Sequence, residues 1–195
     1  FGNVYRETGD FARALNYFEE ALAINESLGD EVASSVNLTS IAQLLYDLND
    51  FDSALDYALR CMPIFEKAHD TNRMTAIYNV LGNIYFKREE YAEAQGYFEK
   101  NLEKTDEGTA AYLIALSGMG KVYYRMQDFQ NAHKCLEEAL EEAIEQDNAE
   151  VQIICNYYLG RMQMDEGDYR QSLAYLNKGF EMAEDYQRKH DVMSL

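Results

Sequence analysis

A short motif recurs five times along this chain at an almost constant spacing. Each copy has glycine or a polar residue, then an acidic residue, then an aromatic residue, with a small residue three places after the ring. The copies begin at Gly9, Asn49, Glu89, Gln127 and Gly167, and only the interval from Glu89 to Gln127 is shorter than the others. A nearly fixed period of about 40 residues is typical of stacked repeats, in which each unit buries its apolar face only against its neighbours. The spacing therefore predicts a repeat array and favours functions carried by surfaces over functions carried by enclosed pockets.

The third repeat shows what one unit contains. Leu81, Gly82 and Tyr85 fall on one helical stripe, and the polar residues 87–90 interrupt it. A second stripe runs through Tyr91, Ala94, Phe98 and Leu102. The pattern predicts a first helix (helix A), a tight turn and a second helix (helix B). The aromatic residue of the motif begins helix B and can fill the wedge between the two helices.

Two small residues keep the same register in every repeat. The first lies in helix A, at Gly2, Ala42, Gly82, Gly120 and Gly160. The second lies in helix B at a constant separation from the first, at Ala14, Ala54, Ala94, Ala132 and Ser172. A large side chain at either position would push the paired helices apart, so we expect these residues to mark a close crossing.

These repeated positions resemble the tetratricopeptide repeat (TPR) family over essentially the whole chain. The resemblance implies an all-α fold, a right-handed α-solenoid of about five helix-turn-helix repeats. The unit of about 40 residues is longer than the usual repeat of about 34, and the family's proline near the end of helix B is missing. Both departures imply helices lengthened by about a turn, as in the long-repeat members that include LGN, kinesin light chain and bacterial signalling proteins.

The register places one domain over residues 1–195 and gives its internal boundaries. We expect repeats at about 1–30, 31–70, 71–108, 109–148 and 149–188, and the start of a further helix at 189–195. The expected A helices are 1–8, 31–48, 71–88, 109–126 and 149–166; the expected B helices are 11–28, 51–68, 91–105, 129–146 and 169–187. We also expect the array to be cut through at both ends.

Two irregularities interrupt this register. Pro63 falls inside a B helix, where it removes a backbone hydrogen bond. It either kinks the helix and redirects the array or is tolerated near the helix end. The short interval between Glu89 and Gln127 is expected to reflect a shorter B helix, or a shorter loop after it, near residues 106–108.

The composition excludes several partners. The net charge is −18, so nucleic acid and anionic membrane surfaces are disfavoured, and no apolar run is long enough to span a membrane. Cys61, Cys135 and Cys155 are scattered through helical patterns and are interpreted as core residues in a reducing compartment. We therefore expect a cytoplasmic location. The excess of glutamate in the B helices is interpreted as a solvated face.

One face of the A helices combines residues suited to binding. In a TPR array the positions around the first small residue, on the side away from helix B, line a concave groove. The predicted groove residues are Asn3, Gln43, Tyr46, Asn79, Asn83, Phe86, Lys87, Lys121, Tyr124, Arg125, Tyr157 and Arg161. They supply hydrogen-bond donors, cations and rings, which an extended peptide with acidic groups could use. The alternative is that they are ordinary solvated residues with rings partly buried between repeats.

No chemistry of catalysis is expected. His69, His133 and His190 are far apart and lack metal-ligand spacing, and Gly118 and Gly120 lie inside a predicted helix with no strand before it. We therefore expect no enzyme activity, no cofactor and no metal. The leading hypothesis is a protein-interaction module that binds a peptide or partner protein in its groove, as a regulatory or sensory region of a larger signalling protein. The alternative is a structural scaffold or self-association domain that forms a homodimer.

Overall fold

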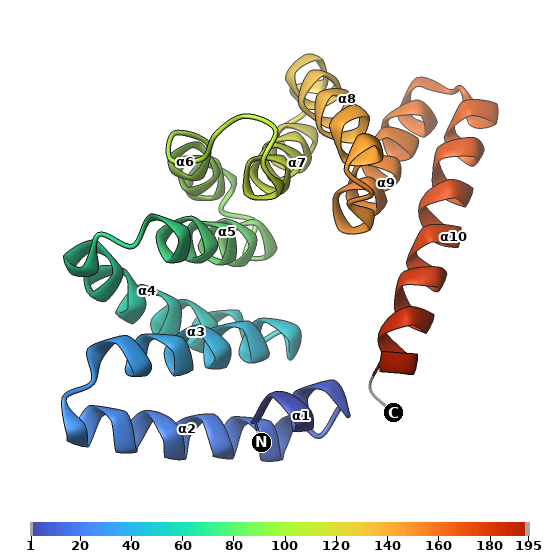
Figure 1. Ribbon diagram of the computed structural model, residues 1–195. Coiled ribbons are helices and arrows are strands. Elements are labelled where there is room, and N and C mark those ends of the chain that lie inside the picture. The colour runs from blue at the N-terminus through green and yellow to red at the C-terminus, as the bar shows by residue number, and fades with distance from the viewer. Residues whose placement is uncertain (1, 194–195) are drawn as a thin grey trace. The chain divides into compact units, whose positions relative to one another are not determined.

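A computed structural model describes residues 2–193, apart from the side chains of residue 7 and residues 187–193. Over this range all regular secondary structure is helical (Figure 1). The helices of this range are α1 (Gly2–Glu7), α2 (Phe11–Leu28), α3 (Glu31–Asp47), α4 (Phe51–Ala68), α5 (Thr71–Lys87), α6 (Tyr91–Leu102), α7 (Ala110–Arg125), α8 (Phe129–Glu145), α9 (Ala149–Glu166) and α10 (Tyr169–Met193). The predicted alternation of A and B helices is confirmed, as is the all-α fold class.

Contacts between helices divide the chain into two compact units, residues 1–90 and residues 91–195. The first unit holds α1 to α5, and the second holds α6 to α10. Within each unit every helix packs on the next one in sequence. In addition, α3 packs on α5 in the first unit and α7 packs on α9 in the second, so that successive A helices are neighbours.

The recurring motif forms the turn between helix A and helix B. Its first residue has a left-handed backbone in all five copies, with φ between 61° at Asn49 and 87° at Gly167. In four copies the aspartate that follows is the N-cap of helix B, and its carboxylate accepts a hydrogen bond from the backbone three places on: Asp10, Asp50, Asp128 and Asp168. The motif therefore ends one helix and begins the next.

The turns between repeats use the same device. Gly29 and His69 are left-handed, and each is followed by an N-cap aspartate, Asp30 or Asp70. The two later turns place Thr109 or Asn148 at the cap, after Gly108 and Asp147. The chain therefore reverses by one local mechanism both within repeats and between them, and this mechanism sets the length of the helices.

The small residues mark close helix crossings, as predicted. A Cβ atom built on Gly120 would lie 2.5 Å from Cγ of Leu136 in α8. The corresponding atom on Gly160 would lie 2.8 Å from Cγ of Leu176 in α10. In the B helices, Ala14, Ala54, Ala94 and Ala132 are completely buried. At these two crossings the backbone of the A helix therefore lies directly against a leucine side chain of the B helix.

One prediction of a helix boundary needs correction. We expected a further helix to begin at residue 189, but α10 continues without a break to Met193. Within residues 169–193, none has the left-handed backbone with which Gly29 and His69 follow the earlier B helices. Residues 194–195 of the predicted helix lie outside the described range. The short repeat does have a short B helix, since α6 has only 12 residues.

Pro63 does not break its helix. The helix α4 runs from Phe51 to Ala68, and Pro63 is exposed on its surface, shortly before the left-handed His69. Exposure allows water to bond the carbonyl that the proline leaves unpaired. Of the two expectations for Pro63, the structure therefore supports the second, that the proline is tolerated near the end of the helix.

Candidate functional site

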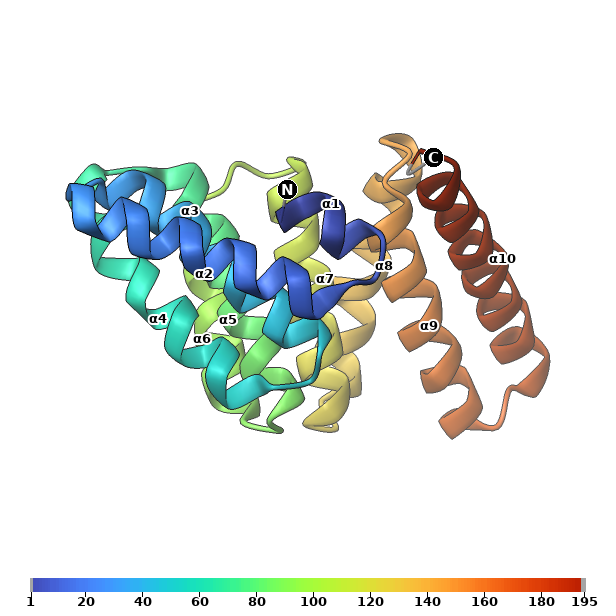
Figure 2. The same ribbon diagram turned by 90° about the horizontal axis from the view of Figure 1, so that it is seen from below.

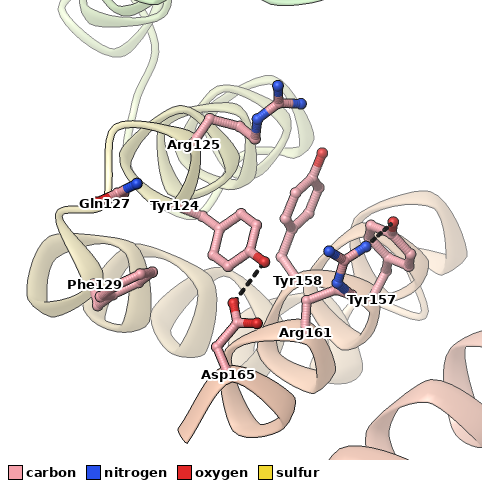
Figure 3. Close-up of a pocket in the computed structure, with 8 residues that line it drawn as sticks. All are labelled: Tyr124, Arg125, Gln127, Phe129, Tyr157, Tyr158, Arg161 and Asp165. Atoms are coloured by element: carbon pink, nitrogen blue, oxygen red, sulfur yellow. Dashed lines mark hydrogen bonds between the residues drawn. The ribbon is translucent and has the colours of Figure 1, made fainter.

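The second unit has a pocket of about 300 Å³ on its A-helix face (Figure 3). Side chains from α7, α9 and the turn that leads into α8 line it. They are Tyr124, Arg125, Gln127, Phe129, Tyr157, Tyr158, Arg161 and Asp165. The packing of α7 on α9 brings these residues together, although they come from two successive repeats.

Four aromatic rings form the frame of the pocket. The Tyr124 ring lies 6.0 Å from Phe129 and 5.5 Å from Tyr158, measured between centroids. The Tyr158 ring in turn lies edge-on to Tyr157 at 5.0 Å. Edge-to-face contacts of this kind stabilise the arrangement of the rings. The frame is therefore preformed, and Tyr157 remains 45% exposed at its edge.

Tyr124 and Asp165 link the two helices across the pocket. The Tyr124 hydroxyl donates a hydrogen bond to Oδ2 of Asp165 at 2.8 Å (Figure 3). Burial raises the pKa of Tyr124 above its usual value, and the hydrogen bond to Asp165 raises it further. The phenol therefore stays protonated at neutral pH and keeps the carboxylate of Asp165 in a fixed position.

Two arginines supply positive charge at the rim. Nη1 of Arg161 donates to the Tyr157 hydroxyl at 3.2 Å, and its guanidinium lies 6.0 Å from the centroid of that ring. The nearby Tyr124 raises the pKa of Arg161, and the hydrogen bond to Tyr157 adds to the effect. The Arg125 guanidinium lies 5.1 Å from the Tyr91 centroid. Both arginines are exposed and lie against rings, so their positive charges are oriented at the rim of the pocket.

The pocket unites four predicted groove residues and adds four others. Tyr124, Arg125, Tyr157 and Arg161 line it together, as the helix register implied. The residues that the prediction omitted are Gln127, Phe129, Tyr158 and Asp165. Phe129 carried a signal, because it is the aromatic of the motif, and Tyr46 packs on Phe51 in the same way at 5.8 Å. In these two repeats the residue four places after the small position packs on the motif aromatic.

Two of the predicted groove residues, Lys121 and Phe86, are buried rather than exposed. Lys121 is only 9% exposed, and its Nζ lies 5.4 Å from the Phe98 centroid. The Phe98 ring also lies against Gly118, one turn before Lys121 on α7, so the lysine packs where α6 and α7 cross closely. Phe86 is 6% exposed. Neither side chain presents the open surface that the groove prediction required.

The predicted residues of the first unit lie on its A helices, and several bond within their own helix. Nε2 of Gln43 donates to Oδ1 of Asp47 at 3.1 Å. Nδ2 of Asn83 donates to Oδ1 of Asn79 at 3.5 Å. The half-buried residues of this set are Gln43, Tyr46, Asn79 and Asn83, and the exposed ones are Asn3 and Lys87. These amides are therefore partly occupied by neighbours one turn away.

The described residues offer little for metal binding or thiol chemistry. Among the residues that the structure describes, no cluster of three or more His, Cys, Asp or Glu side chains could hold a metal ion. The three cysteines are free, and burial raises their pKa values to about 11 for Cys61, about 11 for Cys135 and about 12 for Cys155.

No described helix is long and apolar enough to cross a membrane.

These features define an all-α repeat protein made of helix–turn–helix pairs. A family profile described as the tetratricopeptide repeat matches residues 1–67, 73–141 and 110–185. The chain therefore belongs to the tetratricopeptide repeat family, whose repeats are protein-interaction modules.

Individual relatives agree with this assignment. Response regulator aspartate phosphatase E of Bacillus subtilis (strain 168) is 20% identical over 185 residues, which cover 92% of this chain and 49% of that protein. Protein KINESIN LIGHT CHAIN-RELATED 3 of Arabidopsis thaliana is 26% identical over 147 residues, covering 70% of this chain and 22% of that protein. The chain thus spans no more than half the length of either curated relative.

A solved structure of similar fold is that of a Rap protein complexed with Competence and Sporulation Factor. It superposes with a TM-score of 0.80 over 95% of this chain and 52% of that chain, at 17% sequence identity. At this identity the likeness shows the fold alone.

Proposed function

We propose that this chain binds an extended segment of a partner protein at the α7–α9 pocket. The observation that carries the proposal is the pair of exposed arginines, Arg125 and Arg161, at a pocket with an aromatic frame in a chain of net charge −18. Aromatic residues and arginine dominate the energetics of protein interfaces. Oriented cations on an otherwise acidic molecule are suited to a ligand of the opposite charge.

The chemistry of the pocket favours a segment with a carboxylate next to a flat or apolar side chain. A guanidinium binds a carboxylate through two parallel hydrogen bonds, and Arg161 is held by Tyr157 with further donors to offer. The exposed edge of Tyr157 provides a surface on which a neighbouring ligand side chain can pack. Asp165 lies one turn after Arg161 on the same helix, α9, and, fixed by Tyr124, it disfavours a second negative charge in the ligand.

We extend the proposal to a regulatory role in a larger signalling protein in the cytoplasm. The support is the likeness to a response regulator aspartate phosphatase and to a Rap protein solved with Competence and Sporulation Factor. Both are about twice as long as the region matched here. In this role the chain recognises the signal or partner and performs no catalysis itself.

The test is a selection from a phage-displayed library of short random peptides, followed by synthesis of the best binders. We expect enrichment of sequences that place Asp or Glu, or the C-terminal carboxylate, close to an aromatic or aliphatic residue. We then expect reversal of both charges, Arg125→Glu with Arg161→Glu, to weaken binding of the selected peptide at least about tenfold, which is about 1.4 kcal/mol.

A matched control separates this effect from overall charge. Lys134 is exposed on α8 in the same unit, outside the pocket. Lys134→Glu combined with Lys104→Glu, which is likewise exposed in this unit and outside the pocket, changes the net charge as much as the double arginine variant and should bind the selected peptide as the unmodified chain does. Equal loss in both variants would show a non-specific charge effect, and full binding by the double arginine variant would reject the proposed site.

A further inference from the structure

A pocket of about 410 Å³ lies in the first unit, where α3 packs on both α2 and α4. Figure 2 shows these three helices from below. Its apolar lining is provided by Leu38, Pro63 and Ile64. The exposed residues Glu26 and Arg60 also line it, and Nη2 of Arg60 donates a hydrogen bond to Oε1 of Glu26 at 2.9 Å. The pocket thus combines an apolar wall with a donor and an acceptor placed side by side.

A buried hydroxyl group also lines this pocket. Ser34 of α3 is only 4% exposed, and no atom of the described residues forms a hydrogen bond with its Oγ. A buried hydroxyl without a partner lowers stability. Because rotation about the Cα–Cβ bond turns the hydroxyl towards the pocket, a bound ligand with a polar group can supply the missing hydrogen bond.

The pocket exists because Ser34 is small where the later repeats have a large side chain. The residue eight places before the first small residue of helix A is Ser34 in the second repeat, and Met74, Tyr112 and Gln152 in the next three. Met74 and Gln152 are 5% and 6% exposed, and Tyr112 packs against the core of its unit. Nε2 of Gln152 donates to the carbonyl of Ala143 in the preceding B helix at 2.9 Å. These side chains fill a space that the serine leaves open.

The helix on the other side of the pocket also departs from the repeat pattern. Pro63 and Ile64 of α4 occupy positions that are charged in the two repeats that follow, at residues 103–104 and 141–142. The single proline of the chain therefore lies at a pocket, where it replaces a charge with an apolar surface. Two separate departures from the pattern, one on α3 and one on α4, meet at the same place.

Tyr112 shows which side chain a space of this kind receives. The residues of α8 that correspond to Arg60 and Ile64 are Glu138 and Glu142. Burial raises the pKa of Tyr112, and the charge of Glu138 and its hydrogen bond to the phenol raise it further. The Tyr112 hydroxyl is therefore next to Glu138, the residue at the position of Arg60.

We propose that the pocket in the first unit binds the side chain of a tyrosine from a partner protein. In the complex the ring lies on Leu38, Pro63 and Ile64, in the space that a larger side chain fills in the later repeats. Its hydroxyl donates to Glu26 and accepts from Arg60. A tyrosine suits the site because it has an apolar body and a polar tip. Both residues of the ion pair are exposed, so the backbone of the partner stays outside the pocket.

The test uses p-cresol, which is the side chain of tyrosine, and toluene, which lacks the hydroxyl. Titrations followed by amide chemical shifts should give saturable changes at residues 34–38 and 60–64. We expect p-cresol to bind at least about threefold more tightly than toluene, because only the phenol bonds the ion pair. The tripeptide acetyl-Gly-Tyr-Gly-amide should bind at least as tightly as p-cresol.

Three variants assign the contact. Ser34→Met fills the pocket with the residue type found at Met74, so the fold should be retained and p-cresol should bind at least about tenfold more weakly. The matched control is Ser27→Met, the same change at an exposed serine of α2 outside the pocket, which should bind normally. Arg60→Leu leaves the pocket open and should remove the preference for p-cresol over toluene.

Each outcome decides one part of the proposal. No saturable change at these residues, or equal binding by Ser34→Met and the unmodified chain, overturns the site. Equal affinity for p-cresol and toluene overturns the choice of a phenol. Binding of p-cresol without binding of the tripeptide overturns the protein partner and indicates a free phenolic compound. Arg125 and Arg161 are unchanged in every variant, so failure here leaves the α7–α9 proposal untouched.

Discussion

At the residue scale, glycine has opposite roles at two positions in neighbouring helices. Gly120 lies at the crossing of α7 and α8, against the buried Leu136. Gly96 lies in α6, and a Cβ atom there would meet nothing within 4 Å. The first glycine is required for packing. The second only lowers the helix propensity of α6.

We predict opposite stability changes for alanine at these two sites. Gly120→Ala should lower the free energy of unfolding by about 1–3 kcal/mol, because Leu136 cannot move without disturbing the core. Gly96→Ala should raise it by up to about 1 kcal/mol through helix propensity alone. Urea denaturation of both variants measures the difference. A stabilised Gly120→Ala would show that the crossing is not tight.

The cysteines give a pH-dependent prediction. Burial raises the pKa of Cys155 to about 12 and that of Cys61 to about 11, against an ordinary value near 9. At pH values between the ordinary thiol pKa and the raised one, the unfolded chain has lost thiol protons that the folded chain keeps. The free energy of unfolding therefore falls as the pH rises above about 9. At pH 8 the native thiolate population is therefore about 100-fold lower than in the unfolded chain for Cys61 and about 1000-fold lower for Cys155.

Reaction with Ellman's reagent at pH 8 tests this prediction. The native chain should react at least about 100-fold more slowly than the chain in guanidinium. The half-buried Cys135 should react before Cys61 and Cys155, which are fully buried. Rapid reaction of all three thiols in the native chain would contradict the burial described above.

The sequence predicts which pocket residues share a face better than it predicts their exposure. Periodicity grouped Tyr124, Arg125, Tyr157 and Arg161, which all line the pocket, because helical geometry fixes direction. It could not place Lys121, whose burial depends on the Phe98 ring of another helix. It also missed Tyr158, because that position is serine, valine or glycine in the three preceding repeats and offers no pattern.

At the element scale, helix limits follow from the turns rather than from apolar periodicity. The turns combine a left-handed residue with a capping side chain. The sequence indicates such turns both within repeats and between them, because the pair Gly29-Asp30 has the same residues as the pair Gly9-Asp10. Gln187 and His190 are residue types that are left-handed at Gln127 and His69, yet α10 continues through residues 187–190. The predicted start of a helix at 189 is therefore wrong, and the residue types at this position did not indicate it.

Capping gives a prediction at this scale. The Asp30 carboxylate accepts a hydrogen bond from the Ala33 backbone at 2.9 Å and begins α3. Asp30→Ala should lower the free energy of unfolding by about 1 kcal/mol, whereas Asp30→Asn keeps the acceptor and should cost much less. Chemical denaturation of the two variants compares them. Equal losses would show that charge, and not the cap, provides the stability.

At the scale of the whole molecule, the repeat spacing predicted the fold class from sequence alone. Helix pairs follow one another along the described residues, and the family profile matches most of the chain. Whether the two units form one continuous array remains a prediction, because the third repeat is divided between them, with α5 in one and α6 in the other. We expect function to lie at positions that vary between repeats, and such residues gather at the α7–α9 pocket.

The most direct test of binding at the α7–α9 pocket is a map of amide chemical-shift changes on adding peptide. The chain of 22.5 kDa is small enough for assigned NMR spectra, and the probe is the acidic–aromatic peptide selected from the library. We predict that the largest changes fall in residues 121–129 and 157–165 and that Arg125→Glu with Arg161→Glu removes them. Saturating changes confined to residues 130–145 of α8 or to the first unit would contradict binding at this pocket.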